Sequence, residues 1–256
     1  MELNLHTAMF ADTTSVSADG ATPHNEPGTG YDIIANEYYD ARHITSRNFD
    51  AATRAYLHER SFLLPSDGFA LDLGAGKGRL YEYCGVPAAR IIQTDISERM
   101  LKLREREQAL GRVLADALAL PFRPGAFTIV GAFLFDPYNE KGLFAQVSRV
   151  LSIGGIFIGT IPHYDWGAAL RSDKPRDEAT FVLKSGRALA RRSILSRPEE
   201  LAAELNGVGL QILKNETLLL PRSEKQVSRD IEAPARVMNK SAYEMPIVEL
   251  VAATKI

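Results

Sequence analysis

Three glycines stand at alternate positions in the segment ALDLGAGKGRL, residues 70–80, where Gly74, Gly76 and Gly78 follow Asp72. Glycine lets the backbone turn tightly, and it lets a ligand approach where a Cβ atom would collide. The residues before the glycines are typical of a strand. Those after them are typical of a helix, whose N-terminus offers free N–H groups and the positive end of a dipole. This arrangement predicts ligand binding at the carboxyl edge of a parallel sheet.

Two common nucleotide-binding patterns do not fit these glycines. A P-loop has Gly-x-x-x-x-Gly-Lys-[Ser/Thr], but Leu71 stands at its first glycine position and Gly78 follows Lys77. The dinucleotide pattern Gly-x-Gly-x-x-Gly requires glycine where this chain has Arg79. The pattern Asp-x-Gly-x-Gly-x-Gly is met in full, and here the sequence resembles the class I S-adenosylmethionine-dependent methyltransferases.

Further segments strengthen the resemblance, which covers roughly residues 31–161. Asp95 follows the second predicted strand, where an acidic residue can accept hydrogen bonds from vicinal ribose hydroxyls. Asp116 opens DALALPF, which is similar to the family's Asp-Ala-x-x-Leu-Pro-Phe-x-x-x-x-Phe-Asp segment, although Thr128 replaces the last acid. RVLSIGGIFIGTIP, residues 149–162, is similar to the family's Arg-x-Leu-x-x-Gly-Gly passage from helix to strand.

The resemblance implies S-adenosylmethionine as the cofactor. Its sulfonium is a fixed cation, which carboxylates, carbonyls and aromatic faces stabilise. Asp72 would lie near the ammonium and sulfonium end, because an aspartate buried at a strand end is costly without a partner. Tyr31 and Tyr38 share one helical face and would close over the methionine moiety, unless they form a simple packing stripe. The Asp116 carboxylate or the Ala117 amide would meet the adenine edge. The implied cofactor-binding residues are Tyr31, Tyr38, Asp72, Gly74, Ala75, Gly76, Asp95, Ile96, Met100, Asp116, Ala117 and Phe133.

Short apolar runs alternate with helical stretches along most of the chain. This alternation is typical of a parallel sheet covered on both faces. The predicted fold is α/β, a Rossmann-like, doubly wound, mostly parallel seven-stranded sheet with an N-terminal helical cap. Residues 1–30 form a flexible leader or lid in this prediction, and residues 31–256 form one domain with a cap at 31–66 and a core at 67–256. The predicted strands are 69–73, 90–94, 112–115, 126–134, 155–161, 210–220 and 247–253, and a hairpin is expected at 181–195.

Three segments could contact the methyl acceptor, because loops beyond the carboxyl ends of strands vary freely. The catalytic candidates are His163, Asp136 and His43. We rank His163 first, because an imidazole with a pKa near 6.5 can accept a proton at neutral pH. The alternative is that His163 only donates a hydrogen bond to a backbone carbonyl in its loop. FDPYN, residues 135–139, is similar to the Asp/Asn-Pro-Pro-Tyr/Phe motif of amino-group methyltransferases but lacks its second proline. The expected acceptor-binding residues are Tyr39, Arg47, Phe135, Tyr138, Tyr164 and Trp166.

The amino-acid composition limits the classes of binding partner that we expect. The 256 residues carry 30 Lys+Arg and 32 Asp+Glu, a formal net charge of −2, without a basic cluster. We therefore expect no nucleic-acid or membrane partner, and a small-molecule acceptor such as a secondary or specialised metabolite. The single cysteine, Cys84, suits a reducing cytoplasm, and the scattered histidines do not predict a metal site.

Two other functions stay open at this point. The chain could bind the cofactor and catalyse a reaction other than methylation. It could also be a nicotinamide-dependent oxidoreductase, although Arg79 and the Asp116 segment disfavour that interpretation. The sequence leaves the oligomeric state open.

Overall fold

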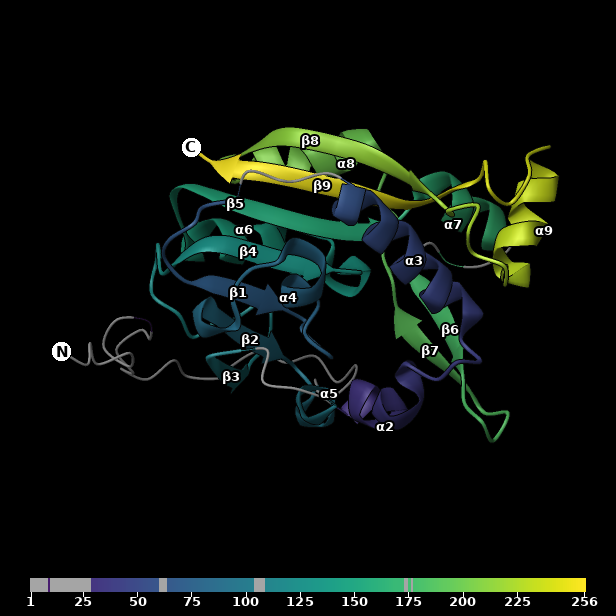
Figure 1. Cartoon of the computed structure of the whole chain (residues 1–256), viewed down its shortest axis with the longest axis horizontal. Coiled ribbons are helices and arrows are strands. Elements are labelled where there is room, and N and C mark those ends of the chain that lie inside the picture. Colours follow the sequence, from purple (N-terminus) through teal and green to yellow (C-terminus); the bar gives the residue numbers. More distant parts are fainter. Residues whose placement is uncertain (1–8, 10–28, 60–63, 104–108, 173–174, 176) are drawn as a thin grey trace.

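The computed structural model describes residues 9, 29–59, 64–103, 109–172, 175 and 177–256. Within them, seven strands form one sheet in the order β3-β2-β1-β4-β5-β9-β8 (Figure 1). The first five strands of this order pair in parallel, whereas β9 pairs antiparallel with both β5 and β8. The strands are β1 (Ala70–Leu73), β2 (Ile91–Asp95), β3 (Gly111–Leu114), β4 (Phe127–Phe133), β5 (Leu151–Pro162), β8 (Leu210–Leu219) and β9 (Pro246–Lys255). The predicted mostly parallel, Rossmann-like α/β fold is confirmed.

The strand order places a switch point beside the glycine segment. From β1 the chain runs outward through β2 and β3, and it then returns to pair β4 on the other side of β1. Leu73 at the end of β1 lies opposite Thr94 of β2 and Ala132 of β4. Open α/β sheets bind ligands in the crevice at such a point. The fold therefore opens a site directly after β1.

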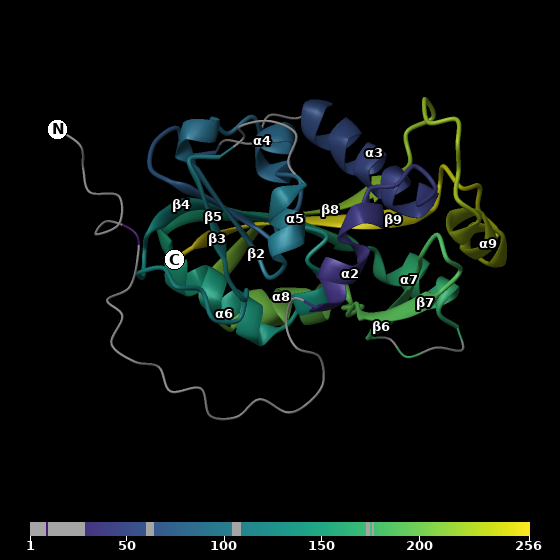
Figure 2. The ribbon, with the colours of Figure 1, turned by 90° about the horizontal axis from the view of Figure 1, so that it is seen from below.

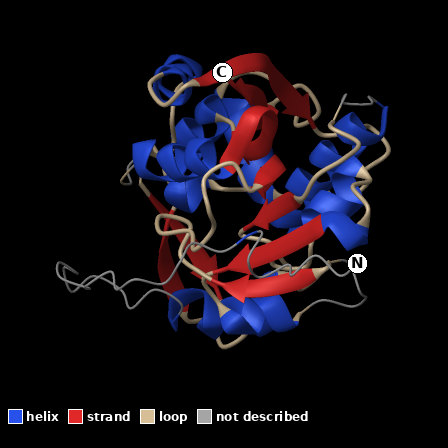
Figure 3. Cartoon of the chain, turned by 90° about the vertical axis from the view of Figure 1, so that its left-hand side faces the viewer, coloured by secondary structure: helices blue, strands red, loops and turns tan. Residues whose placement is uncertain are grey.

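Helices cover both faces of the sheet, as Figures 2 and 3 show. Helices α3 (Ile44–Glu59) and α4 (Arg79–Cys84) lie on one face, and α6 (Lys141–Val150) and α8 (Pro198–Asn206) lie on the other. The second face carries a large core in which Phe144 of α6 packs with Phe157 of β5. Strands buried on both faces need nearly continuous apolar sequence, which explains the Ile, Val and Phe runs.

A cap and a hairpin enclose the carboxyl edge of the sheet. The cap consists of α2 (Thr29–Tyr38), α3 and the loop between them. The hairpin consists of β6 (Glu178–Val182) and β7 (Ala188–Arg192), and it lies next to α2 in Figure 1. The Phe181 ring stacks on Tyr38 with a centroid distance of 6.0 Å, and the Lys184 N–H donates to Glu37 at 2.6 Å. The cap and the hairpin are thus packed against each other.

The remaining elements connect these layers. They are α5 (Glu98–Lys102), α7 (Tyr164–Leu170), α9 (Arg229–Val237) and short 3-10 turns at Ala88–Arg90 and Asp136–Tyr138. The leader predicted at 1–30 lies outside the described residues except at 9, 29 and 30. Met9 is buried in the core, and its carbonyl accepts the Arg123 N–H at 2.9 Å. None of the helices in the described ranges has the length and apolar character needed to cross a membrane.

Candidate active site

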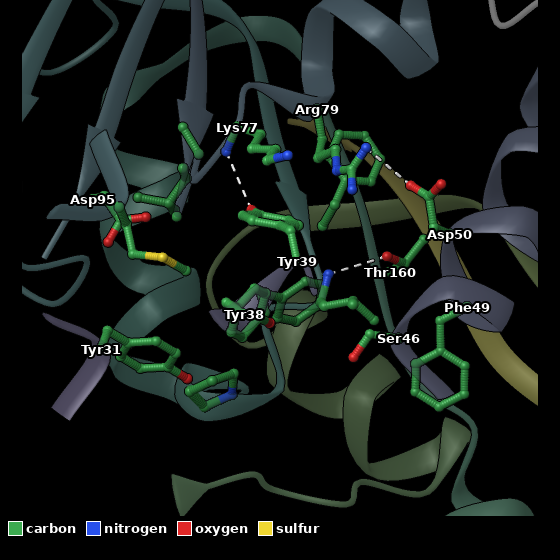
Figure 4. A pocket seen from close by; sticks show the side chains of 18 of the residues that line it. Tyr31, Tyr38, Tyr39, Ser46, Phe49, Asp50, Lys77, Arg79, Asp95 and Thr160 are labelled. Carbon is green, nitrogen blue, oxygen red and sulfur yellow. Dashed lines mark hydrogen bonds and ion pairs between the residues drawn. The ribbon is translucent and has the colours of Figure 1, made fainter. Parts of the chain in front are cut away.

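A cavity of about 320 Å³ lies beyond the carboxyl ends of β1, β2 and β4, beneath the cap (Figure 4). One part of its lining comes from the glycine segment and the neighbouring strand ends, and the other part comes from the cap. The sheet side contributes Leu73, Gly74, Ala75, Lys77, Arg79, Glu82, Tyr83, Asp95, Ile96, Met100, Ala115, Ala117, Phe133, Leu134, Phe135, Pro137, Tyr138, Leu143 and Thr160. The cap contributes Tyr31, Tyr38, Tyr39, Asp40, His43, Ser46, Arg47, Phe49, Asp50 and Thr53.

The glycine turn requires backbone conformations that favour glycine. Gly74 has a φ of 64° and Gly76 a φ of 47°, both in the left-handed region. The Ala75 N–H donates to the Thr94 carbonyl at 2.8 Å, which fixes the turn against β2. A Cβ atom built on Gly74 would meet nothing within 4 Å. The turn therefore presents bare backbone to open space.

Tyr39 lies directly in front of Gly76, in the middle of the side chains drawn in Figure 4. Its hydroxyl accepts the Lys77 N–H at 3.1 Å, and the Lys77 ammonium lies 4.8 Å from its ring centroid. A Cβ atom on Gly76 would collide with this hydroxyl. Burial raises the pKa of Tyr39 to about 12, so the phenol is neutral at physiological pH. A ligand in front of Gly76 requires Tyr39 to move aside.

Two buried aspartates flank the turn and have different surroundings. Asp95 lines the cavity, and its carboxylate accepts the N–H of Gly76 at 3.0 Å and that of Ser97 at 2.9 Å. Burial raises the pKa of Asp95. A carboxylate has about four acceptor positions, so Asp95 can accept further hydrogen bonds. Asp72 accepts the Leu80 N–H at 3.2 Å, and burial raises its pKa to about 8. Asp72 thus holds the first turn of α4 behind the glycines.

Helix α3 directs a polar stripe toward the cavity. His43, just before the helix, and Ser46, Arg47, Asp50 and Thr53 recur at the three- and four-residue spacing of one helical face. The His43 ring lies 4.3 Å from that of Phe181, centroid to centroid. Its Nε2 atom is buried and has no hydrogen-bond partner among the residues that the structure describes. Burial lowers the pKa of His43, so its imidazole is neutral at pH 7.

A charged cluster closes the cavity between α3 and α4. Arg79 forms ion pairs with Asp50 at 3.0 Å and with Glu82 at 2.7 Å. The Tyr83 hydroxyl donates to the Asp50 carboxylate, and Arg54 pairs with the same two acids. Figure 4 shows the Arg79–Asp50 pair on the opposite side of Tyr39 from Asp95. The charges of this cluster are therefore matched within it.

The end of β4 lines the cavity between the glycine turn and the charged cluster. Leu134 has a φ of 57°, which is unusual for a residue with a side chain. Its N–H donates to Thr160 Oγ1 at 3.1 Å, and both residues line the cavity. Backbone strain of this kind concentrates at functional sites. Phe133, Phe135 and Tyr138 add aromatic surface next to it.

A family model described as "Methyltransferase domain" matches residues 71–159, which include β1, the glycine turn, Asp95 and β4. This segment is therefore a methyltransferase domain, in agreement with the resemblance carried by the sequence motifs. No curated protein matches the chain in sequence. The methyl donor of the methyltransferase domain is S-adenosylmethionine.

Solved structures share the fold of the methyltransferase domain. A Listeria monocytogenes protein assigned as an S-adenosylmethionine-dependent methyltransferase is 19% identical, with a TM-score of 0.61 over 81% of this chain and 99% of its own. The methyltransferase in complex with the Haloferax volcanii Trm112 activator is 16% identical, with a TM-score of 0.61 over 88% and 97%. Geranyl diphosphate C-methyltransferase from Streptomyces coelicolor is 14% identical, with a TM-score of 0.56 over 92% of both chains. At these identities the likeness establishes the fold alone.

The lining of the methyltransferase domain fits S-adenosylmethionine. Gly74 leaves open space for a ligand, and Asp95 offers carboxylate oxygens for ribose hydroxyls. The ring centroids of Tyr31 and Tyr38 lie 6.4 Å apart, and the two rings offer aromatic faces for a sulfonium. Asp32 fixes α2 in this place, because its carboxylate accepts the Arg99 N–H at 3.2 Å. Chemically, the donor set suits this cofactor once Tyr39 leaves the front of Gly76.

The cavity gathers most of the residues that the sequence indicated. The expected cofactor-binding residues on its surface are Tyr31, Tyr38, Gly74, Ala75, Asp95, Ile96, Met100, Ala117 and Phe133. The expected acceptor or catalytic residues on its surface are Tyr39, His43, Arg47, Phe135 and Tyr138. The structure places seven others outside the lining, namely Asp72, Gly76, Asp116, Asp136, His163, Tyr164 and Trp166. A role in binding or catalysis stays a prediction for every residue in these sets.

Residues of the PHYDW segment, 162–166, have structural partners in this fold. His163 precedes α7, and its Nδ1 accepts the Asp165 N–H at 3.2 Å. Trp166 donates from Nε1 to the Asp230 carbonyl at 2.8 Å and packs against Phe49. These contacts fasten α7 to α9 and to the cap. His163 therefore bonds to backbone, but its ring accepts an N–H where the alternative had it donate to a carbonyl.

Asp136 is half-buried in the 3-10 turn that follows β4. Its carbonyl accepts the Ile194 N–H at 2.8 Å, and burial raises the pKa of its carboxyl group to about 6. Ser193 and the Arg171 guanidinium oppose that increase. Asp136 thus joins the β4 loop to the chain just after the hairpin.

Sequence reasoning missed several lining residues. The polar face of α3 could have been found from the spacing of Ser46, Asp50 and Thr53, and Arg79 from its place next to the glycines. Nothing in the sequence distinguishes Leu134, because its unusual φ depends on the neighbouring strand. In the part of the chain that the structure describes, no three His, Cys, Asp or Glu residues are grouped to hold a metal ion.

Asp95→Ala should weaken S-adenosylmethionine binding by about 10- to 150-fold, because hydrogen bonds to a charged group contribute about 1.5–3 kcal/mol. Isothermal titration calorimetry would measure the dissociation constant, and circular dichroism would verify folding. Asp67→Ala is the matched control, because the contacts of Asp67 with Arg90 and Thr128 use its backbone carbonyl and the residue lies outside the cavity lining. An unchanged dissociation constant in folded Asp95→Ala protein would remove Asp95 from the site.

Proposed function

We propose that the protein transfers the methyl group of S-adenosylmethionine to a small-molecule acceptor, such as a secondary or specialised metabolite. The observation that carries this proposal is the continuity of the cavity, which runs from the glycine turn to the polar stripe of α3. The cap lines one side of it, and a space of about 320 Å³ suits a small metabolite better than a polymer.

The chain's own residues would perform three tasks. Gly74, Ala75 and Asp95 hold the cofactor, which when bound supplies an electrophilic methyl group. The cap excludes water and keeps the acceptor in line with that methyl group, and such positioning provides much of the rate of a bimolecular reaction. His43 takes the acceptor's proton at Nε2, because this atom of the neutral imidazole is buried and has no hydrogen-bond partner among the residues described.

A small acceptor also agrees with one structural relative. The Streptomyces coelicolor protein is a geranyl diphosphate C-methyltransferase, so its fold accommodates a small organic acceptor. The Haloferax volcanii relative was solved in complex with the Trm112 activator, and co-purification would test whether this protein has such a partner subunit.

Incubation with isotopically labelled S-adenosylmethionine and a metabolite extract from the source organism tests the proposal. We expect one or a few small compounds to gain the labelled methyl group, with an equal amount of S-adenosylhomocysteine. Mass spectrometry measures both products. Label in protein or RNA only would contradict a small-molecule acceptor, and cofactor binding without S-adenosylhomocysteine would indicate a reaction other than methylation.

A further inference from the structure

The cap side of the cavity carries one positive charge that the described residues do not neutralise. Arg47 lies one turn after His43 on the polar stripe of α3, at the exposed rim. Its guanidinium donates only to neutral oxygens, the Ala41 carbonyl at 3.3 Å and Gln226 Oε1 at 3.0 Å. No carboxylate in the described part of the chain forms an ion pair with it.

The other charges that line the cap side are already matched. Asp40 pairs with Arg42 at 3.1 Å and with Lys184 at 2.9 Å. Asp50 and Glu82 share Arg79 and Arg54. A ligand that enters from this side therefore meets one uncompensated cation, and it meets carboxylates that would repel additional negative charge.

We propose that the methyl acceptor carries a single carboxylate, which the Arg47 guanidinium binds at the rim of the cavity; this inference rests on the function proposed above. The planar guanidinium matches a carboxylate with two parallel hydrogen bonds. A phosphate or diphosphate carries more charge than Arg47 neutralises, and the carboxylates of Asp40 and Asp50 line the same cavity. The charge pattern thus favours a monoanion.

His43 specifies a second feature of the acceptor. On a helical face, residues four apart have Cβ atoms about 5–6 Å from each other. The unpartnered Nε2 of His43 can accept a hydrogen bond from a group that lies about one helical turn from the carboxylate. The acceptor is therefore a hydroxy or amino derivative of a carboxylic acid. The oxygen or nitrogen of that hydroxyl or amino group receives the methyl group.

Matched probes test the carboxylate without requiring turnover. Two scaffolds, a 4-hydroxyphenyl ring and a 4-hydroxybutyl chain, would each be presented as carboxylate, primary amide and phosphate. Ligand-observed NMR would measure their dissociation constants with S-adenosylhomocysteine present. We expect the carboxylate to bind about tenfold or more tightly than the amide on at least one scaffold. We expect Arg47→Gln to reduce this preference to about twofold or less, and Arg47→Lys to keep part of it.

The control is Arg236→Gln, which removes an exposed arginine of α9 whose ion pair with Glu232 lies far along the chain from the cavity lining. It should keep the preference for carboxylate. The inference is overturned if amides or phosphates bind as tightly as the carboxylates, if none of the probes binds, or if the preference survives in Arg47→Gln. Failure of the proposed function is a separate result, because the extract would then yield no methylated small compound while the carboxylate preference of the wild-type protein persists.

Discussion

Gly76→Val should abolish S-adenosylmethionine binding and leave a folded domain. The isopropyl group would occupy the space in front of the turn, where only the movable Tyr39 side chain now lies. The φ of 47° adds strain of about 1–2 kcal/mol for a residue with a Cβ atom, which a domain of this size tolerates. Calorimetric titration should show no detectable heat of binding, and thermal unfolding should still be cooperative.

Gly209→Val separates strain from lost ligand space. Gly209 has a φ of 77°, and a Cβ atom there would meet nothing within 4 Å. Its variant should show a comparable loss of stability with unchanged cofactor affinity. If both variants lose cofactor affinity to the same extent, backbone strain explains the loss, and the space in front of Gly76 does not. If Gly76→Val binds normally, the cofactor does not use this turn.

His43→Ala should lower turnover by roughly 10²–10⁴-fold, the usual contribution of a general base. The acceptor for this measurement is the compound labelled in the extract. Because burial lowers the pKa of His43 below its ordinary 6.5, the wild-type rate should stay level near neutral pH and fall only on acidification through that lower pKa. This acidic limb should be absent in the variant. Cofactor affinity should change little.

His163→Ala is the informative control for this prediction. Its imidazole begins α7 by accepting a backbone N–H, so its removal should cost stability on the scale of a helix cap, about 0.5–2 kcal/mol. Turnover per folded enzyme should be nearly unchanged. The base assignment fails if His43→Ala keeps wild-type turnover or the same acidic limb. It moves to His163 if that variant loses the limb instead.

The fold followed closely from local sequence. The apolar runs predicted the sheet strands within a few residues, because a strand covered on both faces has few alternatives to Ile, Val, Leu and Phe. The hairpin expected at 181–195 is present, with its turn at Gly186. The glycine segment predicted the position of the cavity, because the turn after β1 depends mainly on those glycines.

The acceptor side depended on contacts that sequence does not show. PHYDW follows β5 at the correct edge, but α9 and the cap pack against it and turn its side chains away from the cavity. Asp72 satisfies the motif, yet its carboxylate bonds to the backbone of α4. Ser46, Asp50 and Thr53 recur at helical spacing, but the sequence did not show that this face of the predicted cap meets the cavity.

The position of Tyr39 couples the two ends of the cavity. The loop that carries Tyr39 leads directly into His43 and α3. An acceptor that settles on α3 and draws this loop outward would uncover the glycine turn and raise cofactor affinity. Thermodynamic reciprocity then requires the cofactor to raise acceptor affinity by the same factor. Each ligand should therefore bind more tightly when the other is present. A screen without cofactor would underestimate the affinity of an acceptor by that factor.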